Sequence, residues 1–351
     1  MFHHILFNSA IIIAAIFVML HPQASAEGII DGFLLCSNSL IPSLFPFMVL
    51  SNLWLKSGYD RYVVRALEPV MTKVFHLPPA AVSALLLGSI GGFPIGAQTA
   101  VKLYDEGKIS KQDAEHLLMF CSNAGPAFVF GILGHQLFRS TLIGLSLWLI
   151  QILSSMLIGT VLRPHQESHV LCSFRAGSTT PSSFAERLVS SVQDAGHTMI
   201  NICFFILVFS VISSQLYALI PLSWRKSLIA HFIIGLTELT KGIAQLKGVS
   251  QQTAFILSSA LLSWNGVCIH CQVLSCAARR DISFRKYFQG KLLHIIISVT
   301  ASCIIAPFLP LSALCMYTPK HSNIPLIIFA AGCIIFAAVK TSSGKPGELR
   351  I

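Results

Sequence analysis

Residues 91–110 read GGFPIGAQTAVKLYDEGKIS. Three glycines and a proline, the residue types least suited to a helix, fall at positions 91–96, directly after the apolar run at 80–87. In water such a stretch is an ordinary loop. In a lipid bilayer, non-helical backbone is tolerated only where protein buries it or where it lines a watery cavity. The meaning of this stretch therefore depends on the solvent around the chain.

The composition indicates that this solvent is lipid. Hydrophobic residues make up 54% of the 351 residues and charged residues only 11%, against about 25% charged in a typical soluble domain. The apolar residues lie in runs of about 20, the length with which a helix crosses the hydrocarbon core. We therefore predict an all-helical, polytopic membrane protein. The clearest predicted spans are residues 5–20, 141–162, 199–220, 292–309 and 324–339.

Shorter apolar pieces fill much of the remaining chain. They are residues 29–55, 80–90, 117–133, 227–236 and 255–277. We expect Pro42 and Pro46 to interrupt the first piece, because proline breaks the helical hydrogen-bond ladder. Residues 5–20 also fit a secretory signal with a cleavage site at residues 24–26. Because no Lys or Arg precedes this run, we favour an uncleaved first span.

A polar segment rich in Ser, Thr and His divides the chain into comparable halves. No separate soluble domain is predicted. The expected organisation is an N-terminal span or signal anchor at 1–27, a first repeat at 28–162, the polar linker at 163–187, a second repeat at 188–291, and a C-terminal hairpin of spans with a basic tail at 292–351.

The formal net charge of +10 is explained by orientation in the membrane, since cytoplasmic loops collect Lys and Arg. The densest basic cluster consists of Arg279, Arg280, Arg285, Lys286 and Lys291, and the tail carries Lys340, Lys345 and Arg350. We expect both groups to face the cytoplasm. Aromatic residues do not interleave with them, so base stacking and a nucleic-acid partner are not expected.

The ten cysteines do not predict a metal site or a disulfide framework. Cys268, His270, Cys271 and Cys276 supply enough ligand types for zinc, but most other cysteines are scattered through apolar spans, where cysteine packs as a small hydrophobe. The enzyme motifs Gly-x-Ser-x-Gly, Gly-Lys-Ser/Thr and His-Glu-x-x-His are missing from the sequence. His116 is interpreted as a solvated helix residue. We expect no enzyme, no metal and no cofactor.

The two halves share an order of motifs. Each contains a glycine-bearing break, a polar helix, a Gly-[Ile/Val]-Ser turn whose serine can cap the next helix, a short helix, and a second break at Asn and Gly. The first half places these at 92–98, 107–114 and 122–126, and the second at 235–242, 248–254 and 263–266. Such self-similarity points to a transporter built from two repeats, here expected to be inverted, with its site where broken helices meet. A kinked helix with a tight glycine packing face is the alternative.

The motifs of both breaks resemble those of the YlbJ-type sporulation integral membrane proteins, which carry nucleoside-recognition (Gate) domains. The family shows Ser-Gly-Tyr-Pro-Met-Gly-Ala-Lys where residues 91–98 stand, an Asn-rich step before Gly-Pro where 122–126 stand, and Glu-x-Thr-x-Gly where 238–242 stand. Residues 41–47 resemble its Phe-Pro-Ser-Leu-Leu-Pro-Phe segment. The similarity covers residues 26–285. Phe93 replaces the usual Tyr, and Gln98 stands where Lys is common, which puts an anion contact there in doubt.

The resemblance implies a nucleoside-transporter-like helical fold in the mother-cell or outer forespore membrane. It also implies movement of dipicolinate, pyridine-2,6-dicarboxylate, during spore formation. A nucleoside carrier and a non-transport structural or assembly protein of the spore envelope stay open as alternatives. So does a homo-oligomeric state. The expected partners are the lipid bilayer and a small-molecule substrate.

A planar dianion needs positive potential at modest desolvation cost, which the N-termini of broken helices supply. The predicted substrate-binding residues are Gly92, Gly96, Gln98, Asn123, Gly125, Thr237, Thr240, Asn265 and Gly266. Lys102 and Lys241 are further anion candidates, although lysines also snorkel to the interface.

Glu238 is the predicted coupling residue, because an acid within an apolar segment usually marks an ion or substrate path. Desolvation would raise its pKa and let it carry a proton, so coupling to a proton or a monovalent cation is expected. A structural pairing of Glu238 with Lys241 or Lys102 is the alternative.

Overall fold

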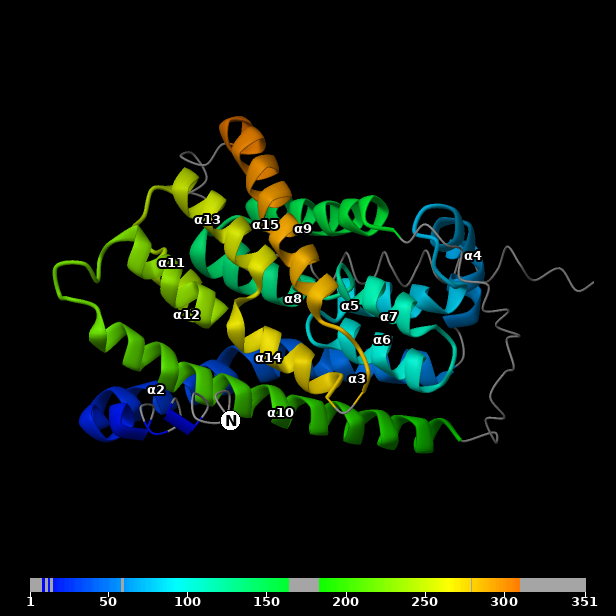
Figure 1. The fold of residues 1–351 in the computed structure, drawn as a ribbon, viewed down its shortest axis with the longest axis horizontal. Helices are drawn as coiled ribbons and strands as arrows, with labels where there is room; N and C mark the ends of the chain where they lie inside the picture. The colour runs from blue at the N-terminus through cyan, green and yellow to red at the C-terminus, as the bar shows by residue number, and fades with distance from the viewer. Residues whose placement is uncertain are drawn as a thin grey trace, which may run out of the picture.

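The computed structural model describes residues 8–9, 12, 15–57, 60–163, 183–278 and 280–309. All regular elements within these ranges are helical, which confirms the predicted fold class (Figure 1). Five stretches are long and apolar enough to cross a membrane: Pro22–Ser57, Thr141–Val161, Phe184–Leu219, Gln251–Cys276 and Arg285–Phe308. They contain the predicted spans at 141–162, 199–220 and 292–309 almost entirely. The predicted span at 5–20 lies partly outside the described residues, which include only its positions 8–9, 12 and 15–20, and the one at 324–339 lies wholly outside them.

The first membrane helix is continuous through its prolines. Helix α2 (Pro22–Leu35) passes through a π-helical segment (Cys36–Leu40) into α3 (Ile41–Ser57), with Pro46 inside α3. The expected interruption at Pro42 and Pro46 is therefore wrong. Membrane helices accommodate proline through local π turns and side-chain hydroxyl bonds. Here a π-helical segment lies just before Pro42, and the Ser43 hydroxyl donates to the carbonyl oxygen of Ser39 within it.

Helix α10 (Phe184–Leu219) begins earlier than expected. The predicted linker runs to residue 187, but Ser183 and Glu186 form a capping box that starts the helix at Phe184. At 1.5 Å per residue, its 36 residues extend about 54 Å, well beyond the ~30 Å hydrocarbon core. The predicted span at 199–220 is its apolar C-terminal part.

The first half is built around two chain breaks. Its elements are α4 (Asp60–Lys73), α5 (Val82–Ile90), α6 (Ile95–Asp105), α7 (Lys111–Leu118), α8 (Pro126–Phe128) with a π-helical continuation (Val129–Leu137), and α9 (Thr141–Val161). Break A separates α5 from α6 at residues 91–94, and break B separates α7 from α8 at residues 119–125.

The second half shows a similar order of breaks. Its elements are α11 (Leu228–Thr237), α12 (Leu239–Gln245), α13 (Gln251–Trp264), α14 (Gly266–Cys276) and α15 (Arg285–Ile305). Break C lies at Glu238, which has extended backbone between α11 and α12, and break D at Asn265, which has a left-handed backbone with φ 80°. An inverted relation between the halves stays a prediction.

Glycines allow the helices on either side of breaks A and C to cross closely. A Cβ atom on Gly96 would overlap the carbonyl oxygen of Cys121, and one on Gly242 would overlap the backbone of Gly235. The glycines around these two breaks therefore serve packing as well as turning, as the alternative in the sequence analysis supposed.

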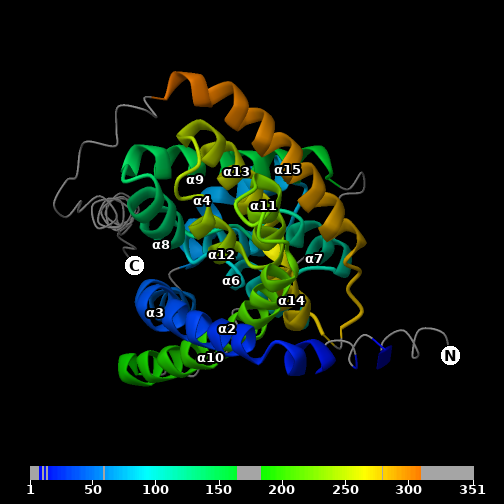
Figure 2. The ribbon, with the colours of Figure 1, turned by 90° about the vertical axis from the view of Figure 1, so that its left-hand side faces the viewer.

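The helices form three layers. In both views α2, α3 and α10 lie along one side, α9, α13 and α15 lie along the other, and α6, α12 and α14 lie between them (Figure 1, Figure 2). The broken helices are thus enclosed by the long apolar ones.

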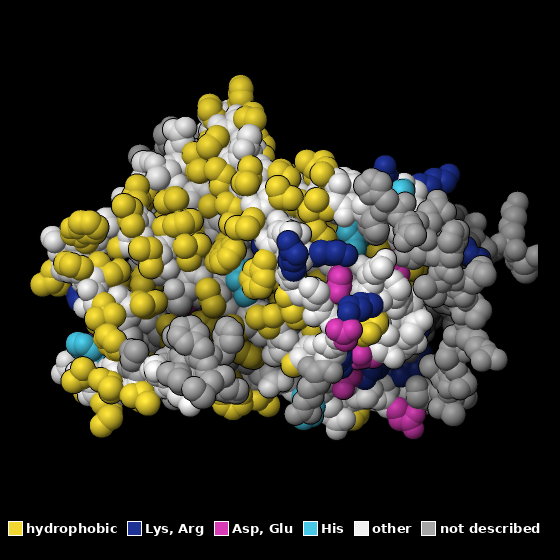
Figure 3. Space-filling view, in the orientation of Figure 1, with side chains coloured by type: hydrophobic (Ala, Val, Ile, Leu, Met, Phe, Trp, Pro, Cys, Tyr) yellow, Lys and Arg dark blue, Asp and Glu magenta, His cyan; other side chains and the backbone are white. Residues whose placement is uncertain are grey.

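The surface separates into an apolar part and a charged part (Figure 3). Large apolar side chains such as Leu153, Phe204 and Ile296 are exposed on the long helices, as expected for contact with lipid. Charged side chains gather where α6 and α7 approach the α14–α15 loop, and they form the pairs Arg280–Asp105, Lys111–Asp281 and Lys286–Glu115. The Arg280 guanidinium holds the pKa of Asp105 below its usual range.

Two predictions about polar residues are wrong. His116, expected in solvent, is 2% exposed and its ring lies 5.3 Å from that of Phe120, because α7 packs between α6 and α15. Lys291, expected in the basic cluster of a cytoplasmic loop, is fully buried, because it lies one and a half turns inside α15 and faces the breaks. Arg280 and Lys286 lie at the surface as expected, and Arg279 lies outside the described residues.

Candidate functional site

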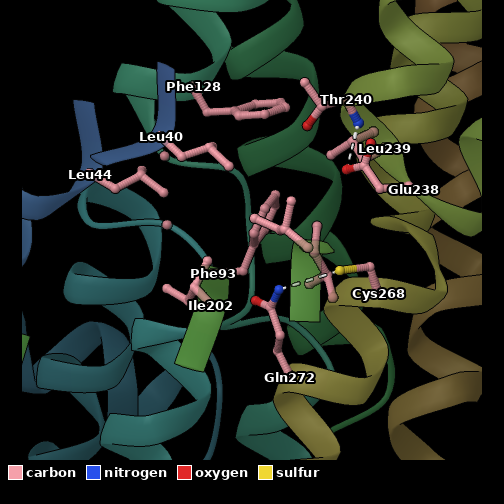
Figure 4. A pocket seen from close by; sticks show the side chains of 14 residues that line it. Leu40, Leu44, Phe93, Phe128, Ile202, Glu238, Leu239, Thr240, Cys268 and Gln272 are labelled. Carbon is pink, nitrogen blue, oxygen red and sulfur yellow. Dashed lines mark hydrogen bonds between the residues drawn. The ribbon is translucent and has the colours of Figure 1, made fainter. Parts of the chain in front are cut away.

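One pocket lies where three of the four breaks and the α2–α3 and α10 helices come together (Figure 4). The first half contributes residues of breaks A and B, the second half residues of break C and α14, and the long helices contribute only apolar residues. The lining consists of Leu40, Leu44, Gly92, Phe93, Gly125, Phe128, Ile202, Ile206, Glu238, Leu239, Thr240, Cys268, Ile269 and Gln272.

Breaks A and B touch at the pocket wall. Gly92 has φ +81°, a left-handed conformation that favours glycine, and a Cβ atom there would lie 2.7 Å from the Gly125 nitrogen. The backbone of both breaks therefore reaches the cavity without side chains in the way. Phe93 and Phe128 pack edge to face beside them, with ring centroids 6.0 Å apart.

Glu238 is the charged residue of the lining. Its side chain is 3% exposed and caps α12, with Oε1 accepting from the Thr240 nitrogen at 3.0 Å and Oε2 from the Lys241 nitrogen at 2.6 Å. No salt bridge joins it to a Lys or Arg within the described ranges. The Lys241 ammonium instead bonds to Ser214 Oγ at 2.8 Å and lies 3.2 Å from Asp31 Oδ2. The backbone donors of break C thus hold the carboxylate in place.

Amide and hydroxyl groups complete the polar side of the pocket. Gln272 Nε2 lies 3.5 Å from Cys268 Sγ, a weak hydrogen bond, and Thr240 follows Glu238 on α12 (Figure 4). Opposite them lie the apolar side chains of Leu40, Leu44 and Ile202. The pocket therefore offers one carboxylate, an amide and a hydroxyl against an apolar and aromatic background.

The cavity has a volume of about 30 Å³, room for about two water molecules. A ring-sized solute does not fit this volume. Such a solute requires the surrounding elements to move apart.

The structure brings four of the predicted site residues together at the pocket, namely Gly92, Gly125, Thr240 and Glu238. Gly96 lies beneath it and packs on the carbonyl group of Cys121. The remaining candidates lie outside the pocket lining. Among the amides, Asn123 donates to the Phe120 carbonyl group and to Ser155, Gln98 contacts Cys276, and Asn265 contacts Ser122. Thr237 bonds within α11, Gly266 packs on Leu239, Lys102 is exposed, and Lys241 faces α10.

Among the lining residues that sequence reasoning missed are two aromatic side chains and one amide, Phe93, Phe128 and Gln272. Phe93 and Phe128 stand within or directly after the breaks, and their aromatic character was the available signal. Gln272 lies seven residues beyond Asn265 on α14, and only its polarity within an apolar run marks it.

Cysteines at the site remain free thiols. Within the described ranges, Cys268, Cys271 and Cys276 form no disulfide, and no group of three or more His, Cys, Asp or Glu side chains has the arrangement of a metal site. His270 Nδ1 forms a hydrogen bond with the Tyr287 hydroxyl at 2.8 Å, so this nitrogen already has a partner within the protein.

Comparison with known proteins supports the resemblance. The family model for nucleoside-recognition (Gate) domains matches residues 38–137, which include breaks A and B. The chain is 27% identical over 331 residues to the sporulation integral membrane protein YlbJ of Bacillus subtilis (strain 168), with 82% of this chain and 80% of the relative covered. No solved structure matches the chain.

Proposed function

Because the chain is a homologue of the sporulation integral membrane protein YlbJ and contains a Gate-type domain, we propose that it is a membrane carrier of a small organic solute. The solute that we propose is dipicolinate. The observation that carries the proposal is the pocket itself, in which breaks from both halves enclose one buried carboxylate. These features support a carrier rather than an enzyme.

The pocket can hold dipicolinate only together with a proton. Two carboxylates within hydrogen-bond distance cannot both stay ionised at low cost, and Glu238 lines the cavity. A proton shared between Glu238 and one dipicolinate carboxylate would remove this repulsion. Phe93 and Phe128 would lie against the pyridine ring, and Gln272 would donate to the other carboxylate. Transport would then be coupled to a proton.

A nucleoside is the second candidate solute. The observation that favours it is the lining, which contains no Lys or Arg side chain. An uncharged planar base needs aromatic contact and hydrogen bonds rather than positive potential, and the pocket offers both kinds of contact.

The test uses purified protein in liposomes loaded with terbium, whose luminescence rises when dipicolinate enters. Gly96→Leu should abolish the protein-dependent signal, because the larger side chain overlaps the carbonyl group of Cys121. Gly131→Leu is the matched control, since nothing lies within 4 Å of a Cβ atom there. Uptake of a radiolabelled nucleoside by the same vesicles, without a terbium signal, would replace dipicolinate by the second candidate.

A structural role is separated from transport by ligand binding. A carrier should gain thermal stability from millimolar dipicolinate or nucleoside, whereas an envelope scaffold has no reason to bind either compound. Folded protein that shows neither flux nor a shift in melting temperature with any of these solutes would overturn the proposal.

A further inference from the structure

The second centre of the molecule is a fully buried lysine between breaks B and D. Lys291 on α15 is 0% exposed. Its Nζ donates to the carbonyl oxygen of Ser122 in break B at 2.8 Å. When the Asn265 amide of break D is oriented so that both of its polar atoms meet complementary partners, its oxygen accepts from Lys291 Nζ at 2.8 Å and its nitrogen donates to the carbonyl oxygen of Leu262. The ammonium thus joins one break of each half.

The ring of Tyr287 completes this arrangement. Lys291 Nζ lies 5.9 Å from the ring centroid, within the range of a cation–π contact. Two oxygens and an aromatic face therefore surround the ammonium. We call Lys291, Ser122, Asn265 and Tyr287 the ammonium site.

No acid partner balances this charge. Within the described ranges, no hydrogen bond or ion pair joins Lys291 to an Asp or Glu side chain. The helices α9 and α13 that pack on α15 contain no titratable residue. The titratable groups on the remaining neighbours are Lys111, Asp113, Glu115 and His116 of α7, Cys121 of break B, and Cys268, His270, Cys271 and Cys276 of α14, with Tyr287 and His294 one turn away on α15 itself. Glu115 is already bound to the Ser283 nitrogen and Lys286.

The groups around the ammonium are of the kind that bind coupling cations in membrane carriers. Where helices break within a membrane, unwound carbonyl groups and the C-terminal ends of half-helices coordinate Na⁺ or a proton. The Ser122 carbonyl group lies in the chain that leaves α7, and Asn265 ends α13. The Lys291 ammonium is therefore a cation that belongs to the protein itself, and it lies at the Ser122 carbonyl group and at Asn265.

We propose that the Lys291 ammonium is the coupling cation of this protein, so that a proton at Lys291 replaces a sodium ion between breaks B and D. When the proton leaves, the N–H bond breaks, its electron pair stays on Nζ, and water that reaches the parted breaks takes the proton. The neutral amine loses most of its attraction for the Ser122 carbonyl group, and the two halves can separate. Reprotonation from the other side of the membrane rejoins them.

The first test needs no transport. Lys291→Ser opens the ammonium site while leaving the Ser122 and Asn265 oxygens, so 150 mM NaCl should raise the melting temperature of this variant by several degrees over choline chloride. Wild type and Lys291→Met, in which an apolar side chain fills the space, should show no shift. Lys286→Ser on the same helix is the control, since its side chain is 46% exposed. Equal responses of Lys291→Ser and wild type to sodium would overturn the proposal.

Sodium gluconate separates cation from anion effects. Stabilisation of wild type by chloride with either cation, lost in Lys291→Met, would show an anion site instead and would also overturn the proposal.

The coupling role rests on the proposed transport function and has its own test. In proteoliposomes, Lys291→Met should keep solute exchange and the accumulation that the Glu238 proton supports, but lose the share of a second proton, which is about tenfold in accumulation at a gradient of one pH unit. Undiminished accumulation in Lys291→Met would contradict the coupling role, even with transport established. If wild type moves no solute, the proposed function fails, while the sodium response of Lys291→Ser still decides whether the ammonium site is a cation site.

Discussion

At the scale of the residue, Glu238 combines two roles that are usually separate. It caps α12 through two backbone donors and also lines the pocket. Each capping bond requires an acceptor oxygen, and Gln keeps one of the two, whereas proton sharing requires the acid. One substitution therefore removes the proton and only part of the cap.

We expect Glu238→Gln to flatten the pH dependence of dipicolinate flux. In wild type, flux should fall as the pH rises, because the shared proton is lost and the two carboxylates then repel each other. The Gln side chain carries no such proton, so its flux should vary less with pH than wild-type flux, and the dependence that remains comes from Lys291. Initial rates in terbium-loaded liposomes check this, with Glu106→Gln at the exposed end of α6 as control. A Glu238→Gln variant that keeps the wild-type pH profile would contradict proton sharing by Glu238.

Gly96 is one of the glycines that allow a close backbone approach at break A. We expect Gly96→Ala to lower stability by about 1–3 kcal/mol, the usual cost of overpacking, because its Cβ atom overlaps the carbonyl oxygen of Cys121. Gly131→Ala should change little, since its surroundings are open. Thermal unfolding of the two purified variants compares these effects. Equal melting temperatures for both would show that the helices at break A are free to shift.

At the scale of the element, hydropathy predicted the long helices because lipid requires about 20 apolar residues in a row. It also placed breaks A and C, since glycine and proline interrupt such runs visibly. Continuity through Pro42 and Pro46 was not predictable, because it depends on a serine hydroxyl and a local π turn. The position of Lys291 was missed for a related reason: a lone charge near the start of an apolar run resembles a loop residue until neighbouring helices are known.

The loop between α14 and α15 is tied to α6 by an ion pair. Arg280 Nε and Nη2 donate to the Asp105 carboxylate at 2.6–2.9 Å, and this lowers the pKa of Asp105. The stabilisation from this ion pair is therefore fully present at pH values above the ordinary pKa of Asp, and it is lost as the pH falls through the lowered pKa of Asp105. The pair is exposed, so we expect an effect of at most about 1 kcal/mol.

A double-mutant cycle of Asp105→Asn and Arg280→Gln checks this prediction through melting temperatures at neutral and acid pH. The coupling between the two substitutions should be small at neutral pH and smaller in acid. Coupling that grows in acid would contradict the assigned sign.

At the scale of the whole molecule, the small pocket volume requires motion between the two halves. We expect Cys268, which lines the pocket, to react with a maleimide faster when substrate and a pH gradient are present. Cys121, buried away from the pocket lining, should stay unlabelled. Mass spectrometry of the labelled peptides measures both sites. Labelling of Cys268 that ignores substrate would show that the pocket does not open during transport.

The candidate site could be predicted only in part, because the pocket forms between helices that are distant in sequence. The sequence placed the motifs along the chain, and four predicted residues meet at the pocket. The long helices that close it contribute Leu40, Leu44, Ile202 and Ile206, which no motif marks. Which apolar residue faces a cavity rather than lipid depends on how helices distant in sequence pack together.

The apolar wall formed by these four residues has a mechanical consequence. It offers a solute no hydrogen-bonding group, so a solute can move along α3 and α10 without breaking a hydrogen bond to them. All polar side chains of the lining come from the opposite side, from break C, α12 and α14. A solute that is hydrogen-bonded on this side only can move together with the broken helices and slide past the apolar wall, because it does not link the two surfaces.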